Sequence, residues 1–286
     1  MSAKDSGVED LAAVQQRDLG TGVCGLRLDT TTFRTAGLVQ ARRMLIESVP
    51  YVINLPISRL WDSYSPGTHL TEVKAHLVER GILSEEGDWV NVDREDFDSR
   101  GSGRREDKVF EFFSDLFNVV LEYLKQRGAV TAVQTMVNAG FVGPESTRIS
   151  TNRPDAYVQV TSPTGGGLIW RKVVSPFEYK FGDGDRNDVG ETELIARWFG
   201  SNPLQNDTKL FWSLYHTMRS DPRRNFALGV TILGTTFRVW LLCRAAPFTF
   251  TPFNWFEVGP VFVLWVPTCL TSPRGPTRSS RSSSSL

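Results

Sequence analysis

The sequence predicts an α/β protein: an N-terminal helical region, then a mixed-sheet domain that ends in a β-hairpin, with disordered stretches at both ends. Two observations indicate this class. Apolar residues recur at helical spacing within residues 31–128, whereas residues 129–257 contain alternating apolar and polar runs bounded by turn residues. Residues 1–30 are polar, and residues 258–286 finish in a Ser/Arg-rich run, a composition typical of disorder.

Length and charge restrict the classes that this protein can belong to. The chain has 286 residues and is 40% hydrophobic, which is enough for one large core or two small ones. Lys plus Arg and Asp plus Glu both number 32, so the whole chain carries no basic footprint for nucleic acid. Its 3 cysteines lie far apart, without metal-ligand spacing or a disulfide framework, which favours a reducing compartment.

Targeting signals are missing from the sequence as it stands. The N-terminus, MSAKDSGVEDL, contains acids and no apolar run, so it does not look like a signal peptide. The longest apolar stretch, residues 258–270, is shorter than the roughly 20 residues that span a bilayer and is interrupted by prolines. We therefore expect an intracellular protein of the cytoplasm or nucleus, without a membrane.

The N-terminal half reads as helices joined by loops. Apolar spacing predicts helices over residues 36–48, 70–80 and 107–126, the last being the strongest. We expect residues 51–60 to form an apolar, Pro-interrupted connection and residues 93–107 to form a charged loop.

The second half alternates strands and helices. Residues 156–161 alternate as a strand does, and residues 170–180 read as a second strand. A short helix is expected over residues 191–199, and a longer one over 207–219 with Asp207 as N-cap. The runs 226–233 and 236–244 are β-rich, and Gly234-Thr235 between them suits a two-residue hairpin turn.

Two acidic residues stand where adjacent strands would begin and end. Pro154-Asp155 precedes the first strand, and Glu178-Tyr179-Lys180 lies near the end of the second. This pattern resembles the PD-(D/E)xK nuclease superfamily, and the resemblance implies a restriction-endonuclease-like domain. Ion-paired surface strands would give the same letters, so a purely structural role is the alternative.

The chemistry behind the pattern is metal-assisted hydrolysis. Two carboxylates on neighbouring strands, Asp155 and Glu178, could hold one Mg²⁺, which prefers oxygen ligands and activates water next to a phosphate. Lys180 points to the same face as Glu178, because side chains alternate along a strand, and could stabilise the hydroxide or the phosphate. Glu111 or Glu122 on the preceding helix could add a third carboxylate; the sequence does not choose between them.

Other features have simpler interpretations. Arg219, Arg223 and Arg224 could contact phosphate, but they more readily satisfy the carbonyl groups at a helix end. Aromatic residues of the last helix and hairpin could stack on bases, although such residues usually form core. His216 has no partner in sequence, and we expect a structural role for it.

The most specific stretch is residues 210–257, which read LFWSLYHTMRSDPRRNFALGVTILGTTFRVWLLCRAAPFTFTPFNWFE. With FEYK at 177–180 and RPDAY at 153–157, it resembles the region that precedes the kinase lobes in the fungal-type protein kinase family of mushroom-forming basidiomycetes. The resemblance implies phosphoryl transfer to Ser or Thr with ATP and Mg²⁺. The chain departs from that pattern: none of its 3 histidines begins a His-Arg-Asp catalytic loop, and no glycine-rich phosphate loop is present.

Three hypotheses follow. The leading one is a non-catalytic accessory or regulatory module that corresponds to the N-terminal part of a fungal-type kinase and acts with a protein partner or a kinase domain. The second is a Mg²⁺-dependent PD-(D/E)xK nuclease or a nucleic-acid-binding relic of one. The third is a fragment of an ATP-dependent Ser/Thr kinase truncated in its gene model, with residues 258–286 as an artefact; ATP enters only with a kinase core outside this chain.

Overall fold

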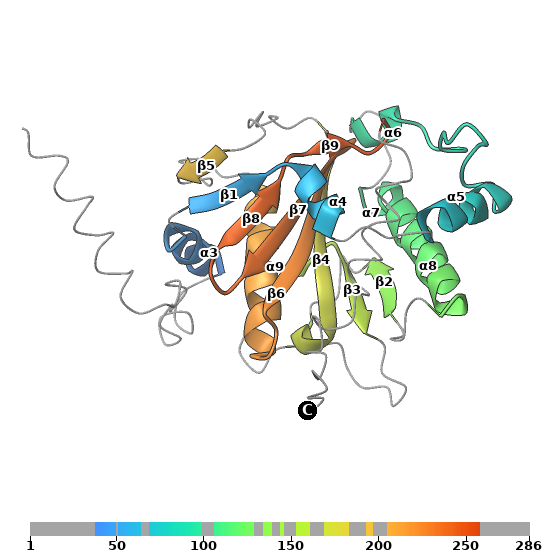
Figure 1. Ribbon diagram of the computed structural model, residues 1–286. Coiled ribbons are helices and arrows are strands. Elements are labelled where there is room, and N and C mark those ends of the chain that lie inside the picture. The colour runs from blue at the N-terminus through green and yellow to red at the C-terminus, as the bar shows by residue number, and fades with distance from the viewer. Residues whose placement is uncertain are drawn as a thin grey trace, which may run out of the picture.

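The computed structural model describes residues 38–49, 51–63, 69–98, 106–128, 134–138, 144–145, 153–160, 169–182, 193–196 and 205–257. The predicted disorder of residues 1–30 and 258–286 lies outside these residues. The coarse fold class is confirmed, because the described chain is a mixed α/β structure built around one mixed sheet (Figure 1).

A single mixed sheet organises the molecule. Its strands follow the order β2-β3-β4-β6-β7-β8-β1-β5, and β9 pairs with β7 beside that path. Neighbours are antiparallel except for the parallel pairs β4–β6 and β1–β8. The strands that form one half are β2 (Gln134–Asn138), β3 (Ala156–Val160), β4 (Val173–Lys180) and β6 (Phe226–Leu233). The other half consists of β7 (Thr236–Cys243), β8 (Pro247–Phe250), β9 (Phe253–Asn254), β1 (Tyr51–Leu55) and β5 (Glu193–Ala196).

The predicted C-terminal hairpin is confirmed. Strands β6 and β7 pair antiparallel over their full length, from Phe226 opposite Cys243 to Leu233 opposite Thr236. Gly234 opens the turn with φ 55°, a left-handed value that favours glycine. Because both faces of this hairpin are buried for most of its length, its sequence is apolar almost throughout.

One face of the sheet packs on helix α8 (Glu111–Gln126), the strongest predicted helix. Phe117 lies 5.5 Å from Phe177 between ring centroids, and Phe110 stacks on Tyr179 at 4.7 Å. Asn118 clamps the helix to β2, because its side chain donates to Met136 O at 2.9 Å and accepts from Met136 N at 2.8 Å.

Shorter helices extend this layer. They are α4 (Ile57–Ser63), α5 (His69–Glu79), α6 (Glu95–Asp98) and α7 (Glu106–Val109). Phe97 of α6 is buried and packs edge-on against Trp255 at 5.1 Å. The expectation of a charged loop over residues 93–107 was therefore wrong at both ends, where α6 and the start of α7 are helical, and Phe97 of α6 carries an apolar side chain into the core.

The opposite face packs on helix α9 (Gln205–Ser220), which lies behind the sheet in Figure 1. Gly229 of β6 lets this helix approach: a Cβ there would meet Leu210 Cδ1 and Leu214 Cδ2 at 3.0 Å. Helix α3 (Leu38–Glu47) packs against α9 through Ala41 and Leu45, in a core cluster that also contains Val52 of β1.

Two expected elements were wrong in type. Residues 51–60 contain strand β1, which pairs with β8 and β5, followed by the start of α4. A strand inside the region expected to be helical therefore belongs to the common sheet. Residues 191–199 contain strand β5 instead of a helix, since it pairs with β1. The second predicted strand begins with a 3-10 turn, η2 (Trp170–Lys172), before β4.

No helix in the described part of the chain is long and apolar enough to cross a membrane.

Candidate functional site

The two predicted acidic residues meet at the end of β4 that lies next to the start of β3. Ala156 of β3 pairs with Phe177 of β4, so Asp155 reaches the level of Glu178. The Asp155 carboxylate accepts a hydrogen bond from the Tyr179 backbone N–H at Oδ2, over 2.8 Å. This bond holds Asp155 against β4 and leaves its other oxygen, Oδ1, turned to a different partner.

That partner is a lysine of α9. Lys209 Nζ lies 4.0 Å from Asp155 Oδ1 and 3.6 Å from Glu178 Oε2. Both carboxylates therefore converge on one cationic group. We refer to Asp155 and Glu178 as the acidic pair.

The members of this group differ in their exposure to solvent. The Glu178 side chain is 0% exposed, whereas Asp155 is 31% and Lys209 is 26% exposed. Solvent or a ligand thus reaches the acidic pair past Asp155 and Lys209. Neither Oε atom of Glu178 accepts a hydrogen bond from any described residue. A buried carboxylate without hydrogen bonds is costly, and such groups gather at functional sites.

The surroundings of Glu178 shift its ionisation. Burial, and then the neighbouring Asp155 carboxylate, raise the pKa of Glu178 well above its usual range. The positive charges of Lys209 and Arg42 act in the opposite direction. When Glu178 carries a proton, it can share that proton with Asp155, because two ionised carboxylates cannot hydrogen-bond to one another.

Arg42 brings the N-terminal helix α3 into this environment. Its positive charge acts on both Glu178 and His216. Burial lowers the pKa of Arg42, and the Glu178 carboxylate partly offsets that effect. Arg42, which belongs to the region predicted to be helical, therefore influences the pKa of Glu178 in the acidic pair.

His216 of α9 is packed among aromatic rings. It stacks on Trp170 at 5.5 Å and meets Trp212 edge-on at 4.7 Å. Burial, assisted by the charge of Arg42, lowers the pKa of His216 to about 4. The imidazole is therefore neutral at neutral pH, which fits the expected structural role.

A second buried ion pair lies at the start of α9. Asp207 Oδ2 lies 3.7 Å from Arg238 Nη1, and both side chains are almost fully buried. Arg238 pairs across the hairpin with Thr231, and Thr231 pairs with Glu178. Asp207 was expected as N-cap, but α9 begins at Gln205 and places Asp207 in its first turn. A polar row thus crosses β4, β6 and β7 beneath the first turns of α9.

The other predicted site residues lie as follows. Lys180 is half-buried in β4 and pairs with Leu233, and strand alternation places it on the same face as Glu178. Glu111 and Glu122 belong to α8, across the sheet from α9. Glu111 Oε2 pairs with Lys108 Nζ at 3.0 Å, and Glu122 is exposed. Neither therefore joins the acidic pair as a third carboxylate.

Sequence reasoning missed Lys209 and Arg42. The sequence offered only an indirect signal for Lys209, because it directly precedes Leu210 and Phe211 on the apolar side of the predicted helix, where a charged residue needs a partner. Arg42 lies more than a hundred residues from the acidic pair in sequence, and only the packing of α3 on α9 brings it close.

A divalent ion fits the acidic pair in its donor chemistry. Mg²⁺ commonly takes one or two carboxylates and completes its shell with water and phosphate oxygens. The two Oε atoms of Glu178 have no other hydrogen-bond use among the described residues, which leaves them available as ligands. Across the described ranges, no group of three or more His, Cys, Asp or Glu side chains is placed to hold a metal. Any ion here would rely on two protein carboxylates.

Comparison of the chain with protein-family models, with curated proteins and with solved structures found no match.

Proposed function

We propose that this protein is a Mg²⁺-dependent phosphodiesterase of nucleic acid, with the acidic pair as its metal-binding centre. The observation that carries the proposal is the convergence of Asp155 and Glu178 on one cationic group, with Glu178 fully buried and its oxygens without hydrogen bonds. Burying a carboxylate in this way lowers the stability of the fold, and groups of this kind cluster at functional sites.

The order of elements supports the restriction-endonuclease-like part of the proposal. The chain runs from helix α8 through β2, β3 and β4, then through the short strand β5 at the far edge of the sheet, to helix α9 and the β6–β7 hairpin. The acidic residues occupy neighbouring antiparallel strands at one end, as the PD-(D/E)xK resemblance requires. Lys180 follows Glu178 by two residues and shares its face, so the lysine of that pattern is kept.

The residues have distinct roles in this proposal. Asp155 and Glu178 would hold the ion, whose chemistry is to acidify a bound water and to neutralise charge on a phosphate. The Tyr179 N–H fixes the Asp155 carboxylate. Lys209 supplies an ammonium group at the open side of the pair, where it can donate hydrogen bonds to a phosphate oxygen. Arg42 adds positive charge from α3.

A cleavage assay tests the proposal. Single-stranded and duplex oligonucleotides should be cut in Mg²⁺ or Mn²⁺ by the wild-type protein, and not after addition of EDTA. Asp155→Asn and Glu178→Gln should each abolish cutting. Glu122→Gln, a carboxylate change on the far side of the sheet, is the matched control and should cut normally. Cutting that persists in both site variants would show that the acidic pair does not carry the activity.

One observation favours the non-catalytic alternative, an accessory module of the fungal-type kinase kind. Lys209 already lies within 4.0 Å of both carboxylates and could balance their charge without a metal. In that case the wild-type protein would bind no divalent ion, and its role would be to present the fold to a protein partner or a kinase domain. The truncated-kinase alternative is decided by genomic sequence beyond the codon for Glu257, where a catalytic loop should be encoded.

A further inference from the structure

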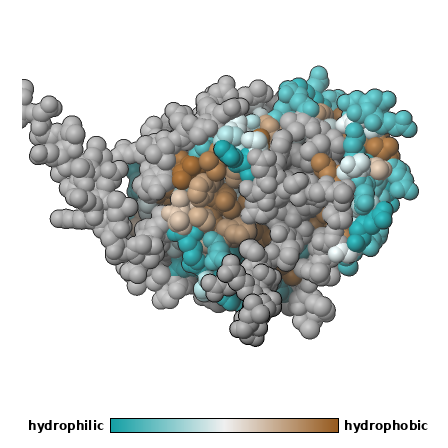
Figure 2. All heavy atoms as spheres, viewed as in Figure 1, coloured by the Kyte–Doolittle hydropathy of each residue, from teal (hydrophilic) through white to brown (hydrophobic). Residues whose placement is uncertain are grey.

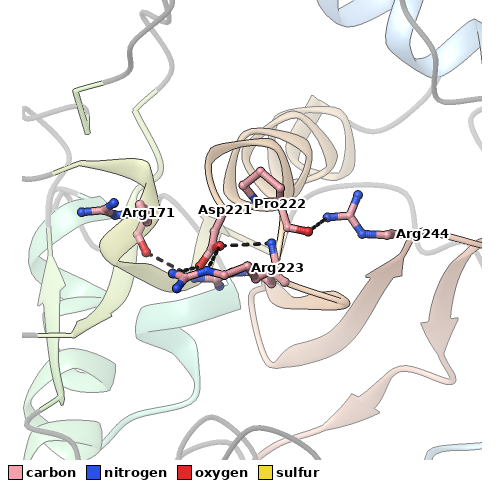
Figure 3. A network of polar contacts seen from close by, with 6 residues as sticks. Arg171, Asp221, Pro222, Arg223 and Arg244 are labelled. Atoms are coloured by element: carbon pink, nitrogen blue, oxygen red, sulfur yellow. Dashed lines mark hydrogen bonds and ion pairs between the residues drawn. The ribbon is translucent and has the colours of Figure 1, made fainter.

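Four arginines gather around the end of α9. They are Arg171, Arg223, Arg224 and Arg244, which we call the arginine stripe, and they come from η2, from the segment after α9 and from the end of β7. Figure 3 shows Arg171 on one side of the α9 terminus, Arg223 below it and Arg244 on the other side. The sequence showed only the two arginines that follow Pro222; the fold adds one on each side.

Backbone carbonyl groups hold two of the four arginine side chains without neutralising them. Arg224 donates to Val174 O and to Arg171 O, both at 3.4 Å, and Arg244 donates to Pro222 O. Within the described residues, Asp221 is the carboxylate that bonds to the stripe, through both oxygens to Arg223. One negative charge therefore faces four positive ones, and three of the arginines are exposed.

An aromatic residue stands beside the stripe. Phe226 pairs with Cys243 at the open end of the hairpin, two residues after Arg224 and opposite the residue that precedes Arg244. Strand alternation places its ring on the face of β6 that carries Leu228, at the sheet end next to the arginines. Its side chain is 40% exposed, whereas the other aromatic residues of α9 and the hairpin are buried. Figure 2 shows hydrophobic surface on the visible face, bordered below by hydrophilic surface.

We propose that the arginine stripe and Phe226 bind single-stranded nucleic acid. A cluster of guanidinium groups suits the phosphates of an extended strand, and an exposed planar fork can bind a phosphate through two hydrogen bonds. An exposed ring near such a cluster can stack on a base, which a duplex would keep within its own stack. Arg223 already binds one oxyanion in this way, because it donates two hydrogen bonds to the two oxygens of the Asp221 carboxylate.

This surface is separate from the acidic pair. Lys209 lies near the start of α9 and the stripe follows its last residue, Ser220, which is about 16 Å further along the helix axis at 1.5 Å per residue. The inference deepens the proposed function by naming a strand-binding surface, but binding at the stripe needs no metal. The two can therefore fail independently.

Fluorescence anisotropy with a labelled single-stranded oligonucleotide in EDTA tests the inference. The wild-type protein should bind, with affinity falling steeply as salt rises. Arg171→Gln and Arg223→Gln should each weaken binding and lower the slope of log affinity against log salt by about 0.7. Phe226→Ala should lower the affinity for the single strand several-fold and leave any affinity for a duplex unchanged. Arg43→Gln, an exposed arginine on α3, is the matched control and should bind as the wild type does.

Circular dichroism and thermal melting must show that each variant is folded, and Arg171 and Arg223 are chosen because both are exposed. Wild-type affinity in the Arg171→Gln/Arg223→Gln double variant would overturn the inference. So would a glutamate-rich peptide that displaces the oligonucleotide at equal concentration, because the stripe would then be a protein-docking surface. Asp155→Asn should keep full binding while losing cleavage, which separates the inference from the proposed function.

Discussion

Replacing Glu178 with Gln should stabilise the metal-free protein at neutral pH. The side chain is fully buried, and neither of its oxygens accepts a hydrogen bond from the described residues. Its main compensation is Lys209 Nζ at 3.6 Å. At an effective dielectric constant near 20, that attraction amounts to ~4–5 kcal/mol. Burying a carboxylate costs several kcal/mol, and the repulsion from Asp155 adds to this cost.

The direction of the pKa decides which effect is larger. The pKa of Glu178 is raised, with burial as the main cause, so the unfavourable contributions exceed the attraction of Lys209 and Arg42. Glutamine keeps the shape and removes the charge. Only the acidic partner changes, and the Lys209 ammonium group that remains is 26% exposed and can be hydrated, so we expect the free energy of unfolding to rise by about 1–3 kcal/mol.

The pH dependence gives the sign of the effect a second test. Folded Glu178 keeps its proton to a higher pH than the unfolded chain, whose carboxyl titrates near 4.5. The wild-type protein should therefore lose stability as pH rises from 4.5 through the raised pKa, and Glu178→Gln should not. Urea unfolding in EDTA across that range measures both proteins. A variant that is less stable than the wild type at neutral pH would refute the reasoning, because the ion pair would then outweigh its desolvation.

Three further changes have expected outcomes of their own. The pKa of His216 is lowered to about 4, so the folded protein should lose ~3 kcal/mol as pH falls from 6.5 to 4, and His216→Gln should remove most of that loss in urea unfolding. Gly229→Ala should destabilise by about 1–3 kcal/mol, since the added Cβ would lie 3.0 Å from two leucine methyl groups of α9; an unchanged melting temperature would contradict this close approach. Asn118→Leu should cost about 1–3 kcal/mol because it removes both hydrogen bonds to Met136, and faster amide exchange at Met136 N–H would localise the loss.

The sequence predicted correctly those elements whose local residue pattern matches the structure that they adopt in the sheet. The hairpin was found because a glycine turn separates two β-rich runs of equal length. Strand β5 was taken for a helix, since its few residues carry no alternation and acquire their conformation from pairing with β1. Strand β1 was taken for a connection because a proline follows it directly. Its partner, β8, lies about two hundred residues further along the chain, so no local pattern indicated the pairing.

The site divides in the same way. Asp155 and Glu178 were found because strand alternation and spacing constrain them locally, and the structure brings them together. The lysine that contacts both came from α9 and not from β4, because helix packing across the sheet decides which ammonium group reaches the pair. The third carboxylate expected from α8 was misplaced, since sequence order says nothing about which face of a sheet a helix covers.

Divalent-ion binding at the acidic pair tests the central claim most directly. Isothermal titration of the wild-type protein with Mn²⁺ should show one site that is lost in Asp155→Asn and retained in Glu122→Gln. Lys209→Met should bind the ion more tightly, because it removes an ammonium group that lies within 4.0 Å of both carboxylates. If neither the wild-type protein nor the Lys209→Met variant binds Mn²⁺, the account is contradicted, and the acidic pair is a structural ion-paired cluster.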